Sequence, residues 1–183
     1  MTKTIVLTGA SDGIGAAAAR QLASSGNRLI VVGRSADKTR AVAADAGAEW
    51  FTADFARLDD VRALAEKLID AVGDGGIDVL ANNAGGIFGD RTPTVDGHEK
   101  TIQVNHLAPF LLTNLLLPTL LASRAAVIHT SSVGHRPFGH IHVDALAHTK
   151  KFSANKAYGD AKLPNVLCPR SPPANVSHHG PRA

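Results

Sequence analysis

The sequence has little cysteine, few aromatic residues and no long apolar run. Its only cysteine is Cys168, which excludes an internal disulfide and agrees with a reducing compartment. The longest apolar stretch, residues 107–121, is interrupted by polar residues and Pro118, so it is too short and too broken to span a membrane. The chain enters an apolar run just after Lys3, without the pattern of a signal peptide. These absences predict a cytoplasmic protein without a membrane span.

Acidic residues become rare toward the C-terminal end, and this shifts the charge balance along the chain. Residues 1–149 carry 13 Lys/Arg and 15 Asp/Glu, whereas residues 150–183 carry 6 and 1. The formal net charge of +3 is therefore a property of the last part of the chain. Because this part lacks interleaved aromatic residues and any nucleic-acid-binding motif, we expect no nucleic-acid partner.

Apolar β-branched runs alternate with helical patterns along most of the chain. Strands are expected at 4–7, 28–32, 49–52, 77–81 and 125–130. Helices are expected at 16–22, 37–47, 58–72 and 95–121, with another that starts near 154. Residues 133–151 lack periodicity and are expected to form a long loop. This alternation predicts an α/β fold with a doubly wound, Rossmann-like parallel sheet.

Residues 4–15, TIVLTGASDGIG, combine a strand, a glycine-rich turn and the start of a helix. Gly9, Gly13 and Gly15 lie in this turn, with a spacing that differs from the G-x-G-x-x-G of most dinucleotide-binding folds. The first N–H groups of a helix are unpaired, and the helix dipole favours an anion in front of them. The turn therefore predicts a pyrophosphate site, although glycine-rich turns also occur without one.

The second expected strand ends at Gly33, and Arg34 follows directly. Sites that prefer NAD commonly carry an acidic residue here, to bind the ribose 2′-hydroxyl. A guanidinium instead suits the 2′-phosphate of NADP through paired, charge-assisted hydrogen bonds. We therefore expect NADP as the cofactor, with NAD as a second possibility; the alternative is a solvated turn arginine.

Tyr158 and Lys162 lie four residues apart, so on a helix their side chains share one face. A neighbouring ammonium lowers the pKa of a phenol and lets it exchange a proton near neutral pH. Such pairs are also common on protein surfaces, but Tyr158 is the only tyrosine in the chain. Ser131 and Ser132 follow the last expected strand, at the sheet edge where open α/β folds place their sites.

Over residues 4 to about 163 these features resemble the short-chain dehydrogenase/reductase family. The glycine turn matches its cofactor loop, residues 82–85 match its NNAG motif, and Asn105, Ser132, Tyr158 and Lys162 match its catalytic tetrad. The similarity is greatest to the retinol-dehydrogenase-like branch, on the 26-residue spacing from Ser132 to Tyr158 and on residues 103–113, QVNHLAPFLLT.

The resemblance implies hydride transfer between NADP(H) and a small carbonyl or alcohol substrate. Tyr158 would donate or accept the proton, Lys162 would activate it, and Ser132 (with Ser131 as the alternative) would orient the carbonyl. Asn105 would anchor a water linked to the lysine. Asp54 would bond the adenine amino group; otherwise it is an ordinary turn residue. The full expected cofactor-binding set is Gly9, Ser11, Asp12, Gly13, Ile14, Gly15, Arg34, Asp54, Phe55, Asn83, Ala84, Gly85, Tyr158 and Lys162. A homo-oligomer is possible.

Other interpretations stay open at this stage. One is a catalytically inactive fragment that at most binds the nucleotide, and another is a nucleotide-sensing regulatory module. The histidines at 135, 140 and 142, with Asp144, suggest a metal site only weakly, so no metal is expected. We interpret these histidines as loop residues around a substrate entrance.

The resemblance weakens after Leu163. Pro164 should interrupt the helix of Tyr158 and Lys162, because proline lacks an N–H and clashes with the preceding turn. Residues 164–183 contain five of the nine prolines and no acidic or aromatic residue. We therefore expect a domain over 1–163 and a disordered tail over 164–183, interpreted as a truncated or out-of-frame end that lacks the last strands of the family fold.

Overall fold

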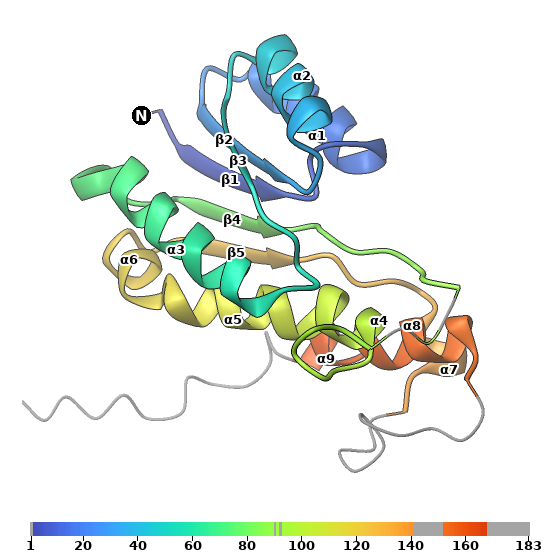
Figure 1. Ribbon diagram of the computed structural model, residues 1–183. Coiled ribbons are helices and arrows are strands. Elements are labelled where there is room, and N and C mark those ends of the chain that lie inside the picture. Colours follow the sequence, from blue (N-terminus) through green and yellow to red (C-terminus); the bar gives the residue numbers. More distant parts are fainter. Residues whose placement is uncertain (1, 90, 92, 141–151, 168–183) are drawn as a thin grey trace, which may run out of the picture.

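A computed structural model describes residues 2–89, 91, 93–140 and 152–167. Within them, five parallel strands form one sheet in the order β3-β2-β1-β4-β5 (Figure 1). The strands are β1 (Thr4–Thr8), β2 (Arg28–Gly33), β3 (Glu49–Thr52), β4 (Val79–Asn82) and β5 (Ala126–His129). The order reverses after β3, so β1 and β4 flank a switch point at the carboxyl edge, and the predicted doubly wound, Rossmann-like fold is confirmed.

Residues of β1 alternate between two apolar cores on opposite faces of the sheet. Val6 pairs with Ile30 of β2 and Leu80 of β4, and all three are fully buried in one core. Ile5 and Leu7 point to the other face and belong to the second core. The strand is therefore apolar without polar alternation, as expected where helices cover both faces.

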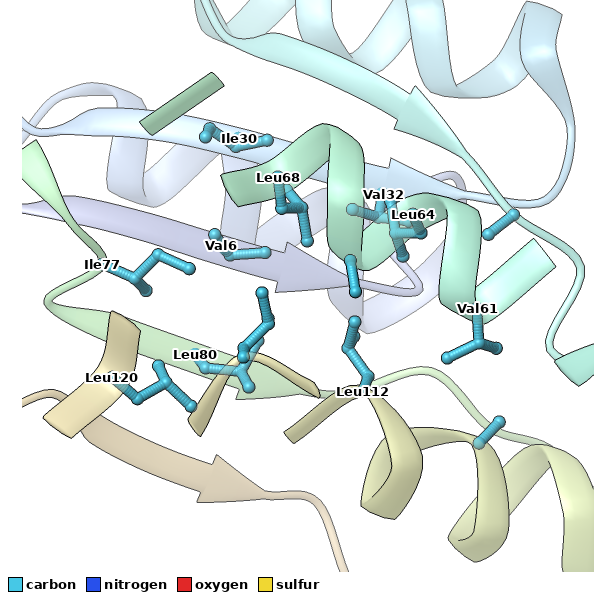
Figure 2. Packing of buried hydrophobic residues seen from close by; sticks show 14 of the residues in the cluster. Val6, Ile30, Val32, Val61, Leu64, Leu68, Ile77, Leu80, Leu112 and Leu120 are labelled. Atoms are coloured by element: carbon cyan, nitrogen blue, oxygen red, sulfur yellow. The ribbon is translucent and has the colours of Figure 1, made fainter. Parts of the chain in front are cut away.

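Helices α1 (Gly13–Ala23) and α2 (Ala36–Ala46) pack on one face, and α3 (Leu58–Val72), α5 (Ala108–Leu115) and α6 (Leu117–Ala122) pack on the other (Figure 1). Figure 2 shows the core that contains Val6, in which Leu64 and Leu68 of α3 face the strands beside Leu112 of α5. This packing fixes the strand ends, and with them the loops that follow.

The long helical region expected at roughly 95–121 starts later and is divided into segments. The structure has α4 (Lys100–Ile102), a π-helix (Gln103–Leu107), then α5 and α6. Glu99 caps α4 by accepting hydrogen bonds from the N–H groups of Thr101 and Ile102, which sets the start at residue 100. Pro109 and Pro118 each lie near the start of the next segment, where a missing N–H is tolerated.

The C-terminal part differs from expectation in two places. A short helix, α7 (His135–Phe138), lies inside the expected loop, whose residues 141–151 fall outside the described part. Helix α8 (Ala154–Lys162) is followed by α9 (Pro164–Leu167), and the Leu163 N–H still donates to the Gly159 carbonyl at 3.0 Å. Disorder starting at Pro164 is therefore wrong for 164–167, because a proline is accommodated in a first helical turn. Residues 168–183 lie outside the described residues, and the out-of-frame interpretation stays a prediction.

Candidate active site

A cleft of about 500 Å³ lies at the carboxyl ends of the strands. All fourteen residues expected to bind a cofactor line it: Gly9, Ser11, Asp12, Gly13, Ile14, Gly15, Arg34, Asp54, Phe55, Asn83, Ala84, Gly85, Tyr158 and Lys162. Asn105 and Ser132 are not among its lining residues. The cleft thus brings the glycine loop, the end of β2 and helix α8 into one space.

The glycine loop packs closely against the segment that follows β4. Gly9 has a φ of +68°, and a Cβ built there would lie 2.6 Å from the Ala84 Cα. A Cβ at Gly15 would lie 2.1 Å from the Gly9 carbonyl oxygen. Any side chain at these two positions would therefore displace the backbone. At Gly13, by contrast, a Cβ would meet nothing within 4 Å, so the loop is open toward the cleft.

Thr8 and Asn83 fasten the glycine loop to the NNAG segment. The Thr8 hydroxyl accepts hydrogen bonds from the N–H groups of Asn83 and Ala84, both at 3.1 Å. The Asn83 Nδ2 donates to the carbonyls of Thr8 at 3.0 Å and Gly9 at 3.4 Å. The amide therefore satisfies backbone groups of the loop, which fixes the distance between two walls of the cleft.

Asp12 of the glycine loop forms an ion pair that the sequence did not predict. Lys38 Nζ donates to Asp12 Oδ2 at 2.7 Å, and Asp12 Oδ1 accepts from the Gly13 N–H at 2.8 Å. These hydrogen bonds, that from Lys38 first, lower the pKa of Asp12. Asp12 and Arg34 both line the cleft, so this ion pair sets a carboxylate with its neutralising ammonium at the cleft wall.

Asp54 lines the cleft and also shapes its own turn. Its Oδ1 accepts from the Ala56 N–H at 3.0 Å, and its backbone N–H donates to Asp60 Oδ2 at 3.1 Å. One carboxylate oxygen of Asp54 therefore stabilises the turn, as in an ordinary turn residue. Phe55 is buried in the core beneath this turn, so it joins the cleft to the packing of α3.

Helix α8 carries Tyr158 and Lys162 into the cleft. Ser153 begins the helix, and its side chain accepts from the Lys156 N–H. The Lys162 Nζ lies 5.6 Å from the centre of the Tyr158 ring and donates to the Thr130 carbonyl at 2.9 Å. Lys162 is 2% exposed, and this burial lowers its pKa to about 8. A phenol and a desolvated amine therefore face the same space.

The two serines after β5 have different partners. The Ser131 hydroxyl donates to the Lys162 carbonyl at 2.8 Å, so it fastens α8 to the sheet. The Ser132 Oγ accepts from the Gly134 N–H at 3.2 Å. A Cβ at Gly134 would lie 3.5 Å from Ser132 Oγ and 3.8 Å from Tyr158 Cδ1, so both side chains lie close to this glycine.

Asn105 lies behind the cleft wall and is fully buried. Its Oδ1 accepts from the Gly86 N–H at 3.0 Å, while its Nδ2 donates to the carbonyls of Gly86 and Thr101, both at 2.9 Å. A Cβ at Gly85 would lie 2.4 Å from Asn105 Oδ1 and 3.0 Å from Lys162 Nζ. Asn105 and Lys162 thus flank Gly85, with the asparagine side chain bonded to backbone.

Several lining residues were not predicted, among them Thr130, Phe88 and Val104. Thr130 was accessible to prediction, because it directly follows β5 and precedes the two serines. Phe88 was not, since it lies in a loop and is placed by tertiary contacts, including Lys100 Nζ 4.8 Å from its ring centre.

Among residues 2–89, 91, 93–140 and 152–167 there is no group of three or more His, Cys, Asp or Glu that could hold a metal ion. His142 and Asp144 lie outside this part of the chain. No helix in the described residues is long and apolar enough to cross a membrane.

Comparison with known proteins identifies the class. The sequence profile of the short chain dehydrogenase family matches residues 3–152. A Streptomyces protein to which daunorubicin C-13 ketoreductase activity is ascribed, DnrU, is 44% identical over 172 residues, which are 90% of this chain and 58% of DnrU. Human retinol dehydrogenase 13 is 39% identical over 174 residues, covering 90% of this chain and 52% of the relative.

Solved structures agree. A protein of Mycobacterium paratuberculosis is 38% identical with a TM-score of 0.79, over 90% of this chain and 59% of that one. A metagenomic short-chain oxidoreductase in complex with NADP is 29% identical with a TM-score of 0.69, over 92% of this chain and 74% of that one.

The chain belongs to the short-chain dehydrogenase/reductase family, a family of oxidoreductases. Within this family, the similarity to retinol dehydrogenases 12 and 13 places the chain in the retinol-dehydrogenase-like branch. The chain spans little more than half the length of the curated relatives it matches.

Proposed function

We propose that this chain is an NADP(H)-dependent oxidoreductase that interconverts a carbonyl and an alcohol on a small molecule. One observation carries the proposal: Tyr158 and Lys162 line the same cleft as the glycine loop and Arg34. An acid–base pair and a basic group suited to a 2′-phosphate therefore share one cavity. Similarity to a structure in complex with NADP supports the choice of cofactor.

The residues present fit a dinucleotide. The loop backbone at Gly13 is open to the cleft, at the N-terminus of α1, where a pyrophosphate is favoured by unpaired N–H groups. Arg34 supplies the positive charge at the ribose end, and Asp54 and Phe55 line the wall beside it. When bound, the nicotinamide supplies a hydride to the carbonyl carbon.

The chain itself handles the proton. Tyr158 donates its hydroxyl proton to the carbonyl oxygen during reduction, and takes a proton from the alcohol in the reverse direction. The Lys162 ammonium stabilises the phenolate left behind, because it lies beside the ring in a desolvated site. Ser132 would orient the carbonyl oxygen, and Asn105 would hold the loop at Gly85 and Gly86.

The test is reduction of a panel of aldehydes and ketones, followed by loss of NADPH absorbance. Tyr158→Phe should lower kcat by about 10²-fold or more while leaving NADPH binding near normal, because it removes the hydroxyl that transfers the proton and keeps the ring that lines the cleft. Lys156→Met, on the same helix but paired with Asp160, serves as the control. Retained turnover in Tyr158→Phe contradicts the role of Tyr158. Binding of NADPH without turnover of any substrate supports the inactive or sensing alternatives.

A further inference from the structure

Asn165 is a buried polar residue of α9 that contacts the backbone of the π-helix. It is 5% exposed and does not line the cleft. Its Nδ2 donates to the Asn105 carbonyl at 2.9 Å, and its Oδ1 lies 2.9 Å from His106 Nδ1. One side chain thus links two consecutive residues of the π-helix to the segment that follows Lys162.

The chemistry of the partners fixes the orientation of this amide. The Asn105 carbonyl can only accept, so the group that faces it must be Nδ2, and Oδ1 then faces His106. The His106 Nδ1 therefore carries a hydrogen and donates it. Burial lowers the pKa of His106, which favours the neutral ring with one N–H.

The Asn105 carbonyl lacks the donor of a regular α-helix because of the sequence around it. In a regular helix it would accept from the N–H four residues later, but that residue is Pro109, which has none. A buried carbonyl without a donor costs free energy. Asn165 supplies the donor, and its own burial shows that the contact is part of the packed interior.

Asn105 also contacts the cleft wall, through its side chain. The Asn105 side chain bonds both the N–H and the carbonyl of Gly86, next to Gly85 and the Lys162 Nζ. A shift or rotation of the π-helix would therefore move the loop at 85–86 against the lysine.

We propose that Asn165 is a positioning residue that clamps the π-helix and so holds Asn105 and the loop at Gly85 and Gly86 in place beside Lys162. The effect on turnover rests on the proposed function, whereas the effect on the loop does not.

Two variants separate the contacts. Asn165→Leu removes both hydrogen bonds, while Asn165→Asp has the same shape, keeps an acceptor for His106 and loses the donor to the Asn105 carbonyl. Both should lower kcat by about 10- to 100-fold, because small displacements of reacting groups are costly. The KM for NADPH should change by a smaller factor than kcat, since the glycine loop and Arg34 are untouched and only the wall at Gly85 and Lys162 shifts.

Asn114→Leu is the matched control, because Asn114 also donates to a helix carbonyl, that of Phe110 at 2.8 Å, but on an exposed face. It should leave kcat and KM as in the unmodified chain.

Hydrogen exchange at the Gly86 amide gives a readout independent of activity. It should quicken in both Asn165 variants and not in the control. If the unmodified chain turns over nothing, the proposed function fails and this exchange still decides the positioning role. Unchanged Gly86 exchange in both variants overturns the inference. So does an Asn165→Asp protein that matches the unmodified chain, because the donor would then be irrelevant. If Asn165→Leu is insoluble, Asn165→Asp decides.

Discussion

Lys162 illustrates at the scale of one residue how burial sets chemistry. Its pKa of about 8 results from desolvation, and its ammonium donates to the Thr130 carbonyl. The proposed role requires the protonated form, so kcat for carbonyl reduction should fall as pH rises above about 8. Steady-state kcat measured from about pH 6 to about pH 10 follows this decrease, the alkaline limb of the pH profile. Lys162→Arg should be slower but lack the limb, because arginine stays protonated, whereas Lys156→Arg should retain it. A flat profile in the unmodified chain contradicts the prediction.

The same shift has a consequence for stability. The pKa of Lys162 falls from 10.5 to about 8 on folding, so the unfolded chain binds more protons between these values. Stability contributed by this group therefore rises with pH across that window and is lost as pH falls through about 8.

The preference for NADPH over NADH is the next prediction that concerns single residues. Arg34 should make NADPH bind more tightly than NADH, and Arg34→Ala should narrow the gap by roughly 1–3 kcal/mol, the scale of a charge-assisted hydrogen bond. Lys38→Met should weaken NADPH more than NADH, because it leaves the Asp12 carboxylate unneutralised in the cleft that Arg34 also lines, where it would repel the additional phosphate of NADPH. Arg40→Ala, on the same helix but paired with Asp37, is the control. Calorimetric titration measures all of these, and equal affinities in the unmodified chain would contradict the assignment.

At the scale of whole elements, α8 packs closely on α7 at Gly159. A Cβ at Gly159 would lie 2.6 Å from the Phe138 Cβ and 2.9 Å from the Gly134 carbonyl oxygen. Gly159→Ala should gain about 1 kcal/mol of stability from helix propensity and lose about 1–3 kcal/mol by overpacking, so the variant should be less stable than the unmodified chain. The displaced helix should also lower kcat, because Tyr158 is the adjacent residue. Denaturant unfolding and kinetics measure both effects.

Gly75→Ala is the control for this substitution, because a Cβ there meets nothing within 4 Å. A Gly159→Ala protein as stable and active as the unmodified chain would show that α8 tolerates displacement.

The elements differ in how far the sequence could predict them. The strands were predictable to within a few residues, because uninterrupted β-branched runs bounded by glycine or polar residues have few other interpretations. The division of 95–121 was not, since the π-helix depends on contacts of Asn105 with Gly86 and Asn165, both distant in sequence. The continuation after Pro164 was not predictable from local sequence either. A proline by itself predicts a break in the helix, whereas the buried Asn165 shows that the next helical turn packs against the rest of the fold.

Within the candidate site, the positions at strand ends could be predicted because parallel strands bring their carboxyl ends to one edge. Those of the fourteen expected cofactor residues that follow β1, β2, β3 and β4 line the cleft for this reason, whereas Tyr158 and Lys162 reach it from α8. The partners of Ser131 and Asp12 could not be predicted, because each depends on the direction of a side chain toward another element. Whether the expected residues perform their proposed roles stays a prediction.

At the scale of the whole molecule, β5 lies at one edge of the five-stranded sheet that the described residues form. In the described residues β5 pairs with β4 alone, so its other side offers backbone N–H and carbonyl groups to any strand that approaches. Ile128 of β5 is 54% exposed, and Phe110 and Leu121 of the neighbouring helices are 49% and 61% exposed. These groups stand out against a sheet whose central strands are buried on both faces.

An apolar open edge of this kind should make the chain self-associate as its concentration rises. Ile128→Lys should reduce that association, because a lysine on an edge strand is costly to bury against a second copy. NADPH affinity should stay unchanged, since Ile128 does not line the cleft. Light scattering across a concentration series measures the effect, with Val95→Lys as a control that adds the same charge at a residue 71% exposed outside the sheet. If both variants reduce association equally, net charge and not the β5 edge is responsible.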